Sequence, residues 1–549
     1  MSTREEKNVS VSTCPLRGNG TVYRTKARLN GPTLLPSPWY ARLMSESGFT
    51  VREPVTALPD PVEAEHVVYN PSLDQLREFS RDLETTTEFG SPAYVSDHQS
   101  RNADKTRNAI DHEFDADDFE HFEDAIEFAE SNELICLDRQ VGRHPDHAYV
   151  CRYYVPKAYG RIALAVAKLF EPVDDPDAEP DFVTVQVPDW DETDIRILPE
   201  EGFTAVLGSD YTGEAKKSFL RLFMLRAKEA GGLGLHAGSK RVRLQREDND
   251  EDDLETVGQL FLGLSGTGKS TLTAHGLDLE DPEDATMLQD DVCALLSDGS
   301  VAGSEGQGLY IKTIGLEREE QPELYDAATD ESAVLENVDV EADGTVDFDS
   351  DHHTTNGRAV IQRSELDSAG EEIDLPNLDQ IFFITRNPVM PPVAKLDPDE
   401  AAAAFMLGES IQTSAGDPSA AGERIRVVGT NPFIMGSEGA EGNRFRDLIE
   451  DLDVDCFVLN TGSVGGRDVG VDDTVTLLEG ISRDTVAWRD DETTGLTVPS
   501  EVPGMDVSAF DVATNLDEAD AKVADLREER REYLAQFADL DDDIESAVY

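Results

Sequence analysis

The chain has 549 residues, with 47 Lys and Arg against 114 Asp and Glu, and its formal net charge is −67. So acidic a chain repels phosphate backbones and anionic lipid headgroups, which argues against nucleic-acid and membrane-surface binding. Disorder is disfavoured because 39% of the residues are hydrophobic and form periodic runs, so the charge predicts a solvated surface adapted to high salt.

The length is sufficient for about two to four domains with a large core. The sequence contains no run of about 18 apolar residues, so no transmembrane helix is predicted. Residues 1–10 lack the apolar block of a signal peptide. The five cysteines are odd in number and scattered, without a Cys-x-x-Cys pair, as is typical of reduced thiols. These features predict a cytoplasmic protein.

The N-terminal half is predicted to begin with loops over residues 1–45. Hydrophobic periodicity then predicts, in chain order, an amphipathic helix over Asp111–Glu133, two strands within Cys136–Tyr154 around a turn at Gly142–Pro145, a strand over Val183–Val187 and a helix over Lys216–Ala230. Gly231–Gly232 ends this helix. We expect the domain boundary there, between an N-terminal domain, 1–232, and a C-terminal domain, 233–549.

The C-terminal half is predicted to contain several strands, and strands and helices alternate after about residue 375. The expected strands are Gly234–Leu244, Gly258–Leu264, Met287–Leu296 with an interruption at Asp290–Asp291, Gln380–Thr385 and Asp455–Leu459. The expected helices are Glu400–Ser410 and Glu518–Phe537. The acidic stretch Glu247–Glu255 predicts a solvated hairpin tip, and the acidic tail Asp539–Glu545 predicts a frayed end.

The sharpest motif is the octapeptide Gly263–Ser270, GLSGTGKS, which matches G-x-x-x-x-G-K-[ST] in full and follows a predicted strand. Its glycines allow consecutive backbone N–H groups to converge on phosphate oxygens. Lys269 adds a positive charge near the β- and γ-phosphates, and the Ser270 hydroxyl can ligate Mg²⁺. The octapeptide therefore predicts a nucleotide triphosphate site.

Other side chains near this motif are candidates for the same site. Asp290 and Asp291 end an apolar strand. Acids at such a position commonly complete the phosphate–metal site that a glycine-rich loop begins. Lysine is a minority choice here, with 13 Lys against 34 Arg, and Lys216–Lys217 could supply a charge or, when deprotonated, a ligand. The alternative interpretation of these lysines is a solvated helix start. His236, in the apolar stretch Leu233–Ala237, is a further candidate, and its alternative is a core histidine with satisfied hydrogen bonds.

Taken together, the motifs become recognisable by their order. The chain resembles the ATP-dependent phosphoenolpyruvate carboxykinase family, most strongly over residues 205–360. The segments that carry the resemblance are Tyr211-Thr-Gly-Glu-Ala-Lys216-Lys217, His236, GLSGTGKS, Asp290–Asp291, Tyr310-Ile-Lys312-Thr-Ile, Leu335-Glu-Asn-Val338 and Thr355-Asn-Gly-Arg358.

The resemblance implies conversion of oxaloacetate and ATP into phosphoenolpyruvate, ADP and CO₂, as in gluconeogenesis. It implies a two-domain α/β fold with mixed sheets, a P-loop nucleotide-binding C-terminal domain and an active site in the interdomain cleft. The implied cofactors are ATP, Mn²⁺ or another transition dication, and Mg²⁺ with the nucleotide. The partners would be small-molecule substrates, with no nucleic acid and no membrane.

The resemblance also assigns roles to residues. Lys217, His236 and Asp291 match transition-metal ligands, Ser270 matches the ligand of the nucleotide's Mg²⁺, and Asp290 matches an acid that organises this site. Catalytic roles fall on Lys217, Lys269, Lys312, Arg358 and Asp290. Substrate binding falls on Arg101, Tyr211, Lys216 and Arg358. Nucleotide binding falls on Ser265, Gly266, Thr267, Gly268, Lys269, Ser270, Thr271, Lys312 and Thr474.

The chain departs from the family pattern at two arginine motifs. The motif of the substrate-carboxylate arginine is not intact, and Arg101 is the nearest candidate, with a surface arginine as the alternative. Near the adenine pocket Thr474 aligns, but Arg467 lies one position early. Two other functions therefore stay open at this point: a related P-loop kinase acting on another substrate, and a catalytically impaired ATP-binding regulatory homologue.

Overall fold

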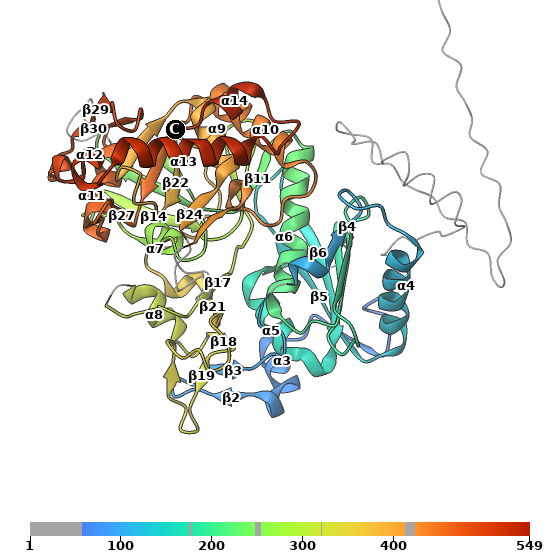
Figure 1. Cartoon of the computed structure of the whole chain (residues 1–549). Helices are drawn as coiled ribbons and strands as arrows, with labels where there is room; N and C mark the ends of the chain where they lie inside the picture. The colour runs from blue at the N-terminus through green and yellow to red at the C-terminus, as the bar shows by residue number, and fades with distance from the viewer. Residues whose placement is uncertain are drawn as a thin grey trace, which may run out of the picture.

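The computed structural model describes residues 58–100, 102–173, 175, 178–246, 254–319, 321–411 and 423–549. The chain is a mixed α/β protein built on two eight-stranded sheets and a five-stranded sheet. In Figure 1 the first large sheet lies on the right, the second lies at the upper left, and the five-stranded sheet lies below. None of the described helices is both long enough and apolar enough to cross a membrane.

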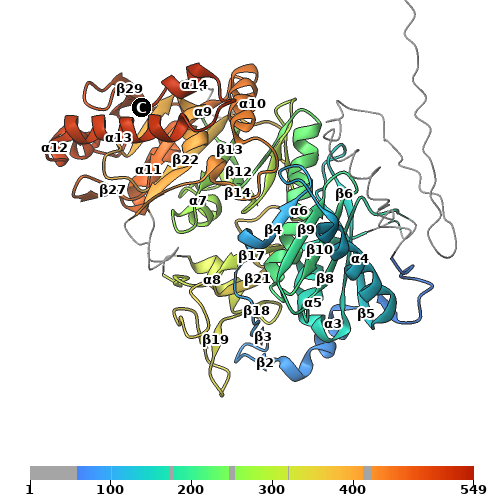
Figure 2. The same ribbon diagram turned by 45° about the vertical axis from the view of Figure 1, so that its right-hand side comes forward.

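The N-terminal sheet mixes parallel and antiparallel pairs. Its order is β1 (Val67–Tyr69), β5 (Leu134–Val141), β6 (Tyr149–Pro156), β8 (Phe182–Val187), β10 (Phe203–Leu207), β9 (Asp194–Leu198) and β4 (Thr106–Asn108), with β7 (Glu171–Pro172) paired to β5. Its faces are covered by α3 (Leu73–Phe79), α4 (Ala116–Ser131), α5 (Gly160–Leu169) and α6 (Thr212–Glu229). One core lies between the sheet, α5 and α6, and another lies under α4, on the other face, as Figure 2 shows.

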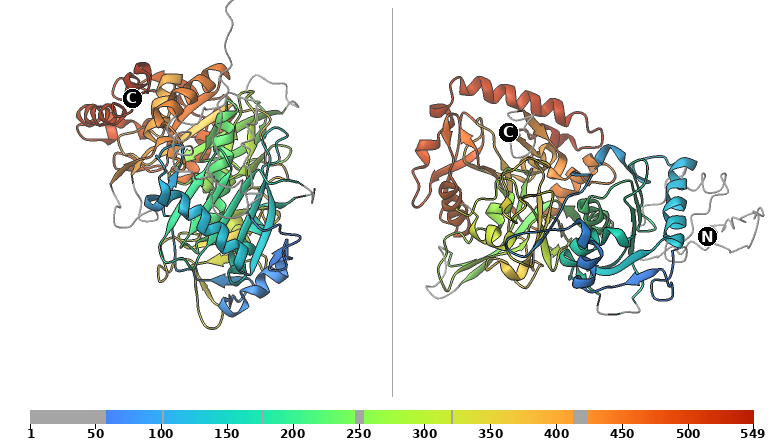
Figure 3. Two further views of the ribbon diagram at one scale, coloured as in Figure 1. Left: turned by 90° about the vertical axis from the view of Figure 1, so that its right-hand side faces the viewer. Right: turned by 90° about the horizontal axis from the view of Figure 1, so that it is seen from below.

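The second large sheet carries the segments of the octapeptide and the acid pair. Its order is β14 (Asp284–Gln289), β12 (Ala237–Leu244), β13 (Glu255–Gly263), β22 (Gln380–Thr385), β26 (Asp455–Asn460), β23 (Val393–Leu396), β30 (Thr497–Glu501) and β29 (Ala487–Asp490). The helices of this half are α7 (Lys269–Ala274), α8 (Pro322–Ala328), α9 (Pro398–Leu407), α10 (Glu438–Asp451), α11 (Val471–Ser482), α12 (Val512–Asn515), α13 (Ala519–Leu534) and α14 (Asp542–Ser546). In the right-hand view of Figure 3, α13 runs along the outer edge of the C-terminal half.

The five-stranded sheet joins strands from distant parts of the chain. Its order is β17 (Gly308–Lys312), β21 (Arg358–Gln362), β18 (Val334–Glu336), β3 (Pro92–Tyr94) and β2 (Thr85–Thr86). Smaller sheets are formed by β11 (Leu233–Leu235), β15 (Cys293–Leu295) and β16 (Val301–Gly303), and by the pairs β19 (Asp339–Val340) and β20 (Val346–Asp347), β24 (Glu409–Ile411) and β25 (Arg424–Arg426), and β27 (Ser463–Val464) and β28 (Arg467–Asp468). Strands from before residue 100 thus pair with strands from after residue 300.

Most predicted elements are confirmed, with shifted ends. The helix predicted at Asp111–Glu133 is α4, which starts where the Asp115 side chain accepts hydrogen bonds from two backbone N–H groups. The acid pair separates β14 from β15 as expected, although these strands belong to different sheets. The loops predicted over residues 1–45 and most of the acidic hairpin tip lie outside the described residues, and β12 and β13 pair antiparallel around that tip.

Three predictions about element ends are wrong. The strand expected at Gly234–Leu244 is broken at His236 into β11 and β12. The helix expected at Glu400–Ser410 stops at Gly408, whose φ of 42° is left-handed, and strand β24 follows. The tail is not frayed, because its helix α14 buries Ile544, and Arg530 Nη1 donates a 2.6 Å hydrogen bond to the Tyr549 carbonyl.

Candidate active site

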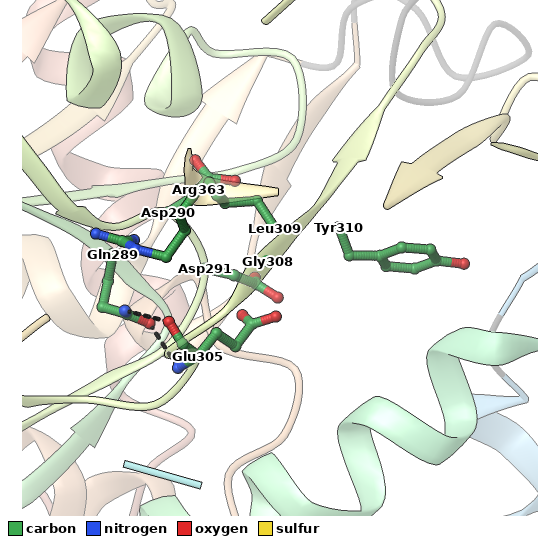
Figure 4. A pocket seen from close by; sticks show the side chains of 8 residues that line it. All are labelled: Gln289, Asp290, Asp291, Glu305, Gly308, Leu309, Tyr310 and Arg363. Carbon is green, nitrogen blue, oxygen red and sulfur yellow. Dashed lines mark hydrogen bonds between the residues drawn. The ribbon is translucent and has the colours of Figure 1, made fainter. Parts of the chain in front are cut away.

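Four segments that are far apart in the sequence converge on one cluster of charges. They are the start of α6, the break between β11 and β12, the turn between β14 and β15, and the segment before β17. Figure 4 shows the pocket at this point, with the carboxylates of Asp291 and Glu305 near one another and Tyr310 to one side. The Gln289 side chain holds the backbone of Glu305 in place through hydrogen bonds of 3.0 Å to its N–H and its carbonyl.

Asp291 is the centre of this cluster. Its Oδ2 lies 2.5 Å from Lys217 Nζ and 2.8 Å from Lys216 Nζ, and its Oδ1 lies 2.9 Å from His236 Nε2. Lys216 Nζ also lies 2.9 Å from Glu305 Oε1. We call these five residues the lysine–carboxylate cluster; sequence reasoning identified four of them and missed Glu305.

The pKa values of the two adjacent lysines are shifted in opposite directions. Burial favours the neutral amine and lowers the pKa of Lys217 to about 8. Lys216 is also buried, but it lies between two carboxylates, Asp291 and Glu305, and their attraction raises its pKa above the ordinary value. Burial alone would raise the pKa of Asp291, yet the two ammonium groups hold that pKa well below its usual range.

His236 presents an unprotonated ring nitrogen to the cluster. Its Nδ1 lies 2.7 Å from the Thr430 carbonyl, so Nδ1 carries the proton and Nε2 keeps its lone pair. Burial and the nearby Lys269 ammonium lower the pKa of His236 to about 4, which keeps the imidazole neutral. The break in the strand at His236 allows the ring to face Asp291.

The residues present fit a transition dication. Within the described ranges, no group of three or more His, Cys, Asp and Glu could hold a metal ion. Lys217 Nζ, His236 Nε2 and the Asp291 carboxylate nevertheless converge as a mixed nitrogen–oxygen donor set. The neighbouring Asp290 has a buried Oδ1 that is without a hydrogen-bond partner in the part of the chain that the structure describes, so this oxygen is free for a cation or a bound water.

The octapeptide forms a tight loop between β13 and α7. Gly266 and Gly268 have φ values of 81° and 97°, which other residues rarely adopt. At Gly263 a Cβ would lie 2.6 Å from Thr267 Oγ1, so the close turn requires glycine there. Ser265 and Gly266 are exposed, while Lys269, Ser270 and Thr271 are half-buried. Residues 263–271 are called the phosphate loop below.

The phosphate loop is held from outside by two residues that sequence reasoning did not single out. Thr461 Oγ1 donates a 2.7 Å hydrogen bond to the Thr267 carbonyl, and Arg386 Nη1 donates a 3.2 Å hydrogen bond to the Gly266 carbonyl. Both follow the ends of adjacent parallel strands, β22 and β26. On the inner side, Lys269 Nζ lies 3.9 Å from Asp291 Oδ1 and 3.5 Å from His236 Nε2, so loop and cluster are in contact.

Tyr211 and Arg358 are joined through one side chain, Asn356. Asn356 Nδ2 donates a 3.2 Å hydrogen bond to Tyr211 Oη, and Asn356 Oδ1 accepts a 2.9 Å bond from Arg358 Nη2. Arg358 lies opposite Lys312 in the β17–β21 register. Burial, with the Arg358 charge, lowers the pKa of Lys312 to about 8.

The remaining residues predicted from the sequence are Arg101 and Thr474. Arg101 lies outside the described residues, although its neighbours are anchored near Tyr211: the His98 N–H donates to Asp210 Oδ1 at 2.8 Å, and the Asn102 N–H donates to Glu214 Oε1 at 2.7 Å. The buried Thr474 hydroxyl donates to the Gly470 carbonyl at 2.9 Å, within the first turn of α11. The Arg467 guanidinium lies over the Phe510 ring, 4.4 Å from its centroid.

Comparisons with known proteins agree on one family. The family model described as phosphoenolpyruvate carboxykinase matches residues 86–508. The phosphoenolpyruvate carboxykinase (ATP) of Aeropyrum pernix is 35% identical over 476 residues, which are 85% of this chain and 94% of that protein. The proteins of the same name from Chelativorans sp. and Azorhizobium caulinodans are 28% identical over 78% of this chain and 81% of theirs, and 30% identical over 70% and 72%.

Proposed function

The chain belongs to the ATP-dependent phosphoenolpyruvate carboxykinase family, and we propose that it converts oxaloacetate and ATP into phosphoenolpyruvate, ADP and CO₂ at the lysine–carboxylate cluster and the phosphate loop. The observation that carries this assignment is the contact between the two: Lys269 of the loop lies 3.9 Å from Asp291 of the cluster. A triphosphate on the loop would thus meet a keto diacid beside the cluster.

The chemistry has two steps that both develop negative charge. Loss of CO₂ breaks the bond between C3 and C4 of oxaloacetate, and the electron pair moves to the C2 oxygen as an enolate. That oxygen attacks the γ-phosphorus, the bond to the β–γ bridging oxygen breaks, and ADP leaves. Fixed cations in a water-poor site stabilise such charges more than water does, because they need no reorganisation.

The proposed roles follow the positions of the positive charges. Lys269 and Lys312 bind the transferring phosphoryl group, and Arg358 binds both the substrate and the γ-phosphate. Tyr211, Lys216 and Arg101 bind oxaloacetate, with Asn356 orienting Tyr211 and Arg358. Ser265, Gly266, Thr267, Gly268, Ser270 and Thr271 cradle the phosphates through the loop, and Thr474 borders the adenine end.

Two dications complete the proposal. Lys217, His236 and Asp291 would hold Mn²⁺ or a similar ion, and Ser270, with Asp290 nearby, would hold the nucleotide's Mg²⁺. Such ions supply Lewis-acid stabilisation of developing oxygen charge. Lys217 must be neutral to serve as a ligand, and its lowered pKa supports this role.

We also infer two domains, 1–232 for oxaloacetate and 233–549 as a P-loop domain for nucleotide and metal, with the site in the cleft between them. The pairing of β3 with β18 supports a close junction at this site. A cytoplasmic location without nucleic-acid or membrane partners is supported by the −67 net charge and by four described cysteines that are all unpaired.

A steady-state assay tests the proposal by measuring oxaloacetate-dependent ADP formation with and without Mn²⁺. We expect turnover that requires oxaloacetate and is stimulated by Mn²⁺. A rate of ATP hydrolysis that does not depend on oxaloacetate, or ATP binding without any turnover, would show that the assignment is wrong.

A further inference from the structure

Lys240 is a fully buried lysine outside the cluster and the loop. It lies on β12, and its Nζ donates hydrogen bonds to the carbonyls of Leu272, at 2.5 Å, and His275, at 2.6 Å. These carbonyls belong to the C-terminal end of α7, where a helix cannot satisfy its own acceptors. The ammonium also lies 5.5 Å from the centroid of the Phe261 ring.

In the described part of the chain, the surroundings of Lys240 contain no balancing acid. Among the residues that the structure describes, no carboxylate lies within ion-pair distance of Lys240 Nζ, and burial alone lowers the pKa of this lysine to about 7. An unpaired buried ammonium is costly compared with an apolar side chain of similar length. Simple packing of the core therefore does not account for a lysine at this position.

The strand that carries Lys240 is in direct contact with α7. Two residues earlier on the same face of β12, a Cβ on Gly238 would lie 2.3 Å from Thr273 Oγ1, so only glycine allows this approach. The Thr273 hydroxyl in turn donates to the Lys269 carbonyl at 2.8 Å. Strand β12 begins one residue after His236, and α7 begins at Lys269, so this contact connects the cluster to the phosphate loop.

We propose that Lys240 is a positioning residue for nucleotide binding: its ammonium fixes the C-terminal end of α7 on β12 and thereby holds Lys269 and Ser270 in place for the triphosphate. This inference rests on the proposed function, because it requires the loop to bind ATP. Charged donors form stronger hydrogen bonds than neutral ones. ATP affinity should therefore decrease when Lys240 loses its proton.

The groups that face Lys240 are few. From α7 and its end come the carbonyls of Leu272 and His275, and the neighbouring strands contribute Gln259, Phe261 and Met287. His275 is the titratable neighbour, and burial lowers its pKa, followed by the Lys240 charge, while Asp278 and Asp472 raise it. This lowered pKa disfavours a charged imidazole beside the Lys240 ammonium.

The test is direct ATP binding to Lys240→Met by calorimetry, at about pH 6 and about pH 8.5. Methionine preserves the length of the side chain but removes the charge and the donors. We expect ATP to bind about tenfold more weakly than to the wild type at the lower pH, and less than about threefold more weakly at the higher pH. The KM for oxaloacetate should stay within about twofold.

Lys168→Met is the matched control. Lys168 lies on α5, burial lowers its pKa, and its Nζ donates to the Ser332 carbonyl at 2.6 Å, but it contacts no part of the phosphate loop. We expect this variant to bind ATP as the wild type does at both pH values. An equal loss of ATP affinity in both variants would mean that the effect is not specific to Lys240, and the inference would be overturned.

Two further results separate the possible failures. If Lys269→Ala binds ATP like the wild type, the proposed function itself fails; if Lys269→Ala loses binding but Lys240→Met does not, only the role of Lys240 fails. Should Lys240→Met not fold, hydrogen exchange of the wild-type amides 269–275, corrected for intrinsic rates, replaces it. We expect weaker protection at about pH 8.5 than at about pH 6, and equal protection contradicts the inference.

Discussion

The lysine–carboxylate cluster and the phosphate loop are adjacent but are built on opposite principles. In the cluster, buried lysines and carboxylates lie within 3 Å of one another and fix their own geometry. In the loop, glycine conformations and outside contacts from Thr461 and Arg386 fix the backbone, while Ser265 and Gly266 remain exposed. The cluster is therefore fixed mainly by its own ion pairs, whereas the loop is fixed by its backbone and by neighbouring residues.

This comparison predicts that changes in the cluster affect both stability and catalysis, while changes in the loop affect catalysis alone. The largest effect is expected for Asp291→Asn, because it leaves Lys216, Lys217 and His236 without their shared carboxylate. We expect kcat to fall by at least about 10⁴ and the free energy of unfolding to fall by about 3 kcal/mol. Turnover with Mn²⁺ and urea denaturation measure the two effects.

Asp490→Asn is the control for this change, because Asp490 is exposed on the edge strand β29. It should alter neither quantity measurably. An Asp291→Asn enzyme with normal stability would contradict the view that the cluster is held together by its own charges.

The second effect concerns the loop. Lys269→Ala removes a half-buried ammonium whose distance to Asp291 Oδ1, 3.9 Å, is long for an ion pair. We expect kcat to fall by about 10³, because a fixed positive charge at the phosphoryl group is lost, while the free energy of unfolding changes by less than about 1 kcal/mol. A large decrease in the free energy of unfolding of Lys269→Ala would contradict the prediction that changes in the loop affect catalysis alone.

The third effect distinguishes two lysines of α6, Lys217 near its start and Lys228 near its end. Lys217→Ala removes the proposed neutral metal ligand, so we expect Mn²⁺ to activate at least about tenfold more weakly, with ATP affinity nearly unchanged. Lys228→Ala, near the end of the same helix, breaks an ion pair to Glu441 and a 3.2 Å hydrogen bond to the Met435 carbonyl, and it should keep normal Mn²⁺ activation. A Mn²⁺ titration of turnover measures both, and the metal assignment is wrong if both variants respond like the wild type.

The same contrast explains what the sequence could predict. The phosphate loop depends largely on residues that are consecutive in the chain, so the octapeptide after an apolar strand predicted the loop but not its contacts with Thr461 and Arg386. His236 and Asp291 were found because they belong to motifs in a recognisable order. Glu305 and Asn356 were not found, since their partners Lys216 and Tyr211 lie 89 and 145 residues away and only tertiary packing brings them together.

Fold predictions failed for a related reason. The acidic tail has the composition of a frayed end, but Leu540, Ile544 and Val548 recur along it and pack into the core around α9 and α13. The break at His236 is invisible in an apolar run, because periodicity does not report that a single residue must face a neighbouring carboxylate. Local pattern predicts elements, whereas long-range charge pairing decides where they are interrupted.

The smallest effect on catalysis is expected for a charge cluster outside the site, which can be compared with the cluster at Asp291. Glu409 accepts hydrogen bonds from Arg530, at 2.9 Å, and Arg426, at 2.6 Å, and is almost fully buried. Burial alone would raise the pKa of Glu409, but the two guanidinium groups hold this pKa at about 2. Glu409→Gln should therefore lower the free energy of unfolding by about 3 kcal/mol near neutral pH and leave kcat unchanged.

The pH dependence of this loss has a definite sign. Because the folded-state pKa of Glu409 is depressed, the carboxylate stabilises the fold fully above the ordinary glutamate pKa of about 4.3 and loses this contribution as the pH falls towards 2. The difference in unfolding free energy between wild type and Glu409→Gln, from urea titrations, should shrink over that range. Glu532→Gln, exposed on α13, should show no difference at any pH. If Glu409→Gln also reduced kcat, buried charge pairing would matter for catalysis throughout the molecule, and the cluster at Asp291 would no longer be distinguished by its position.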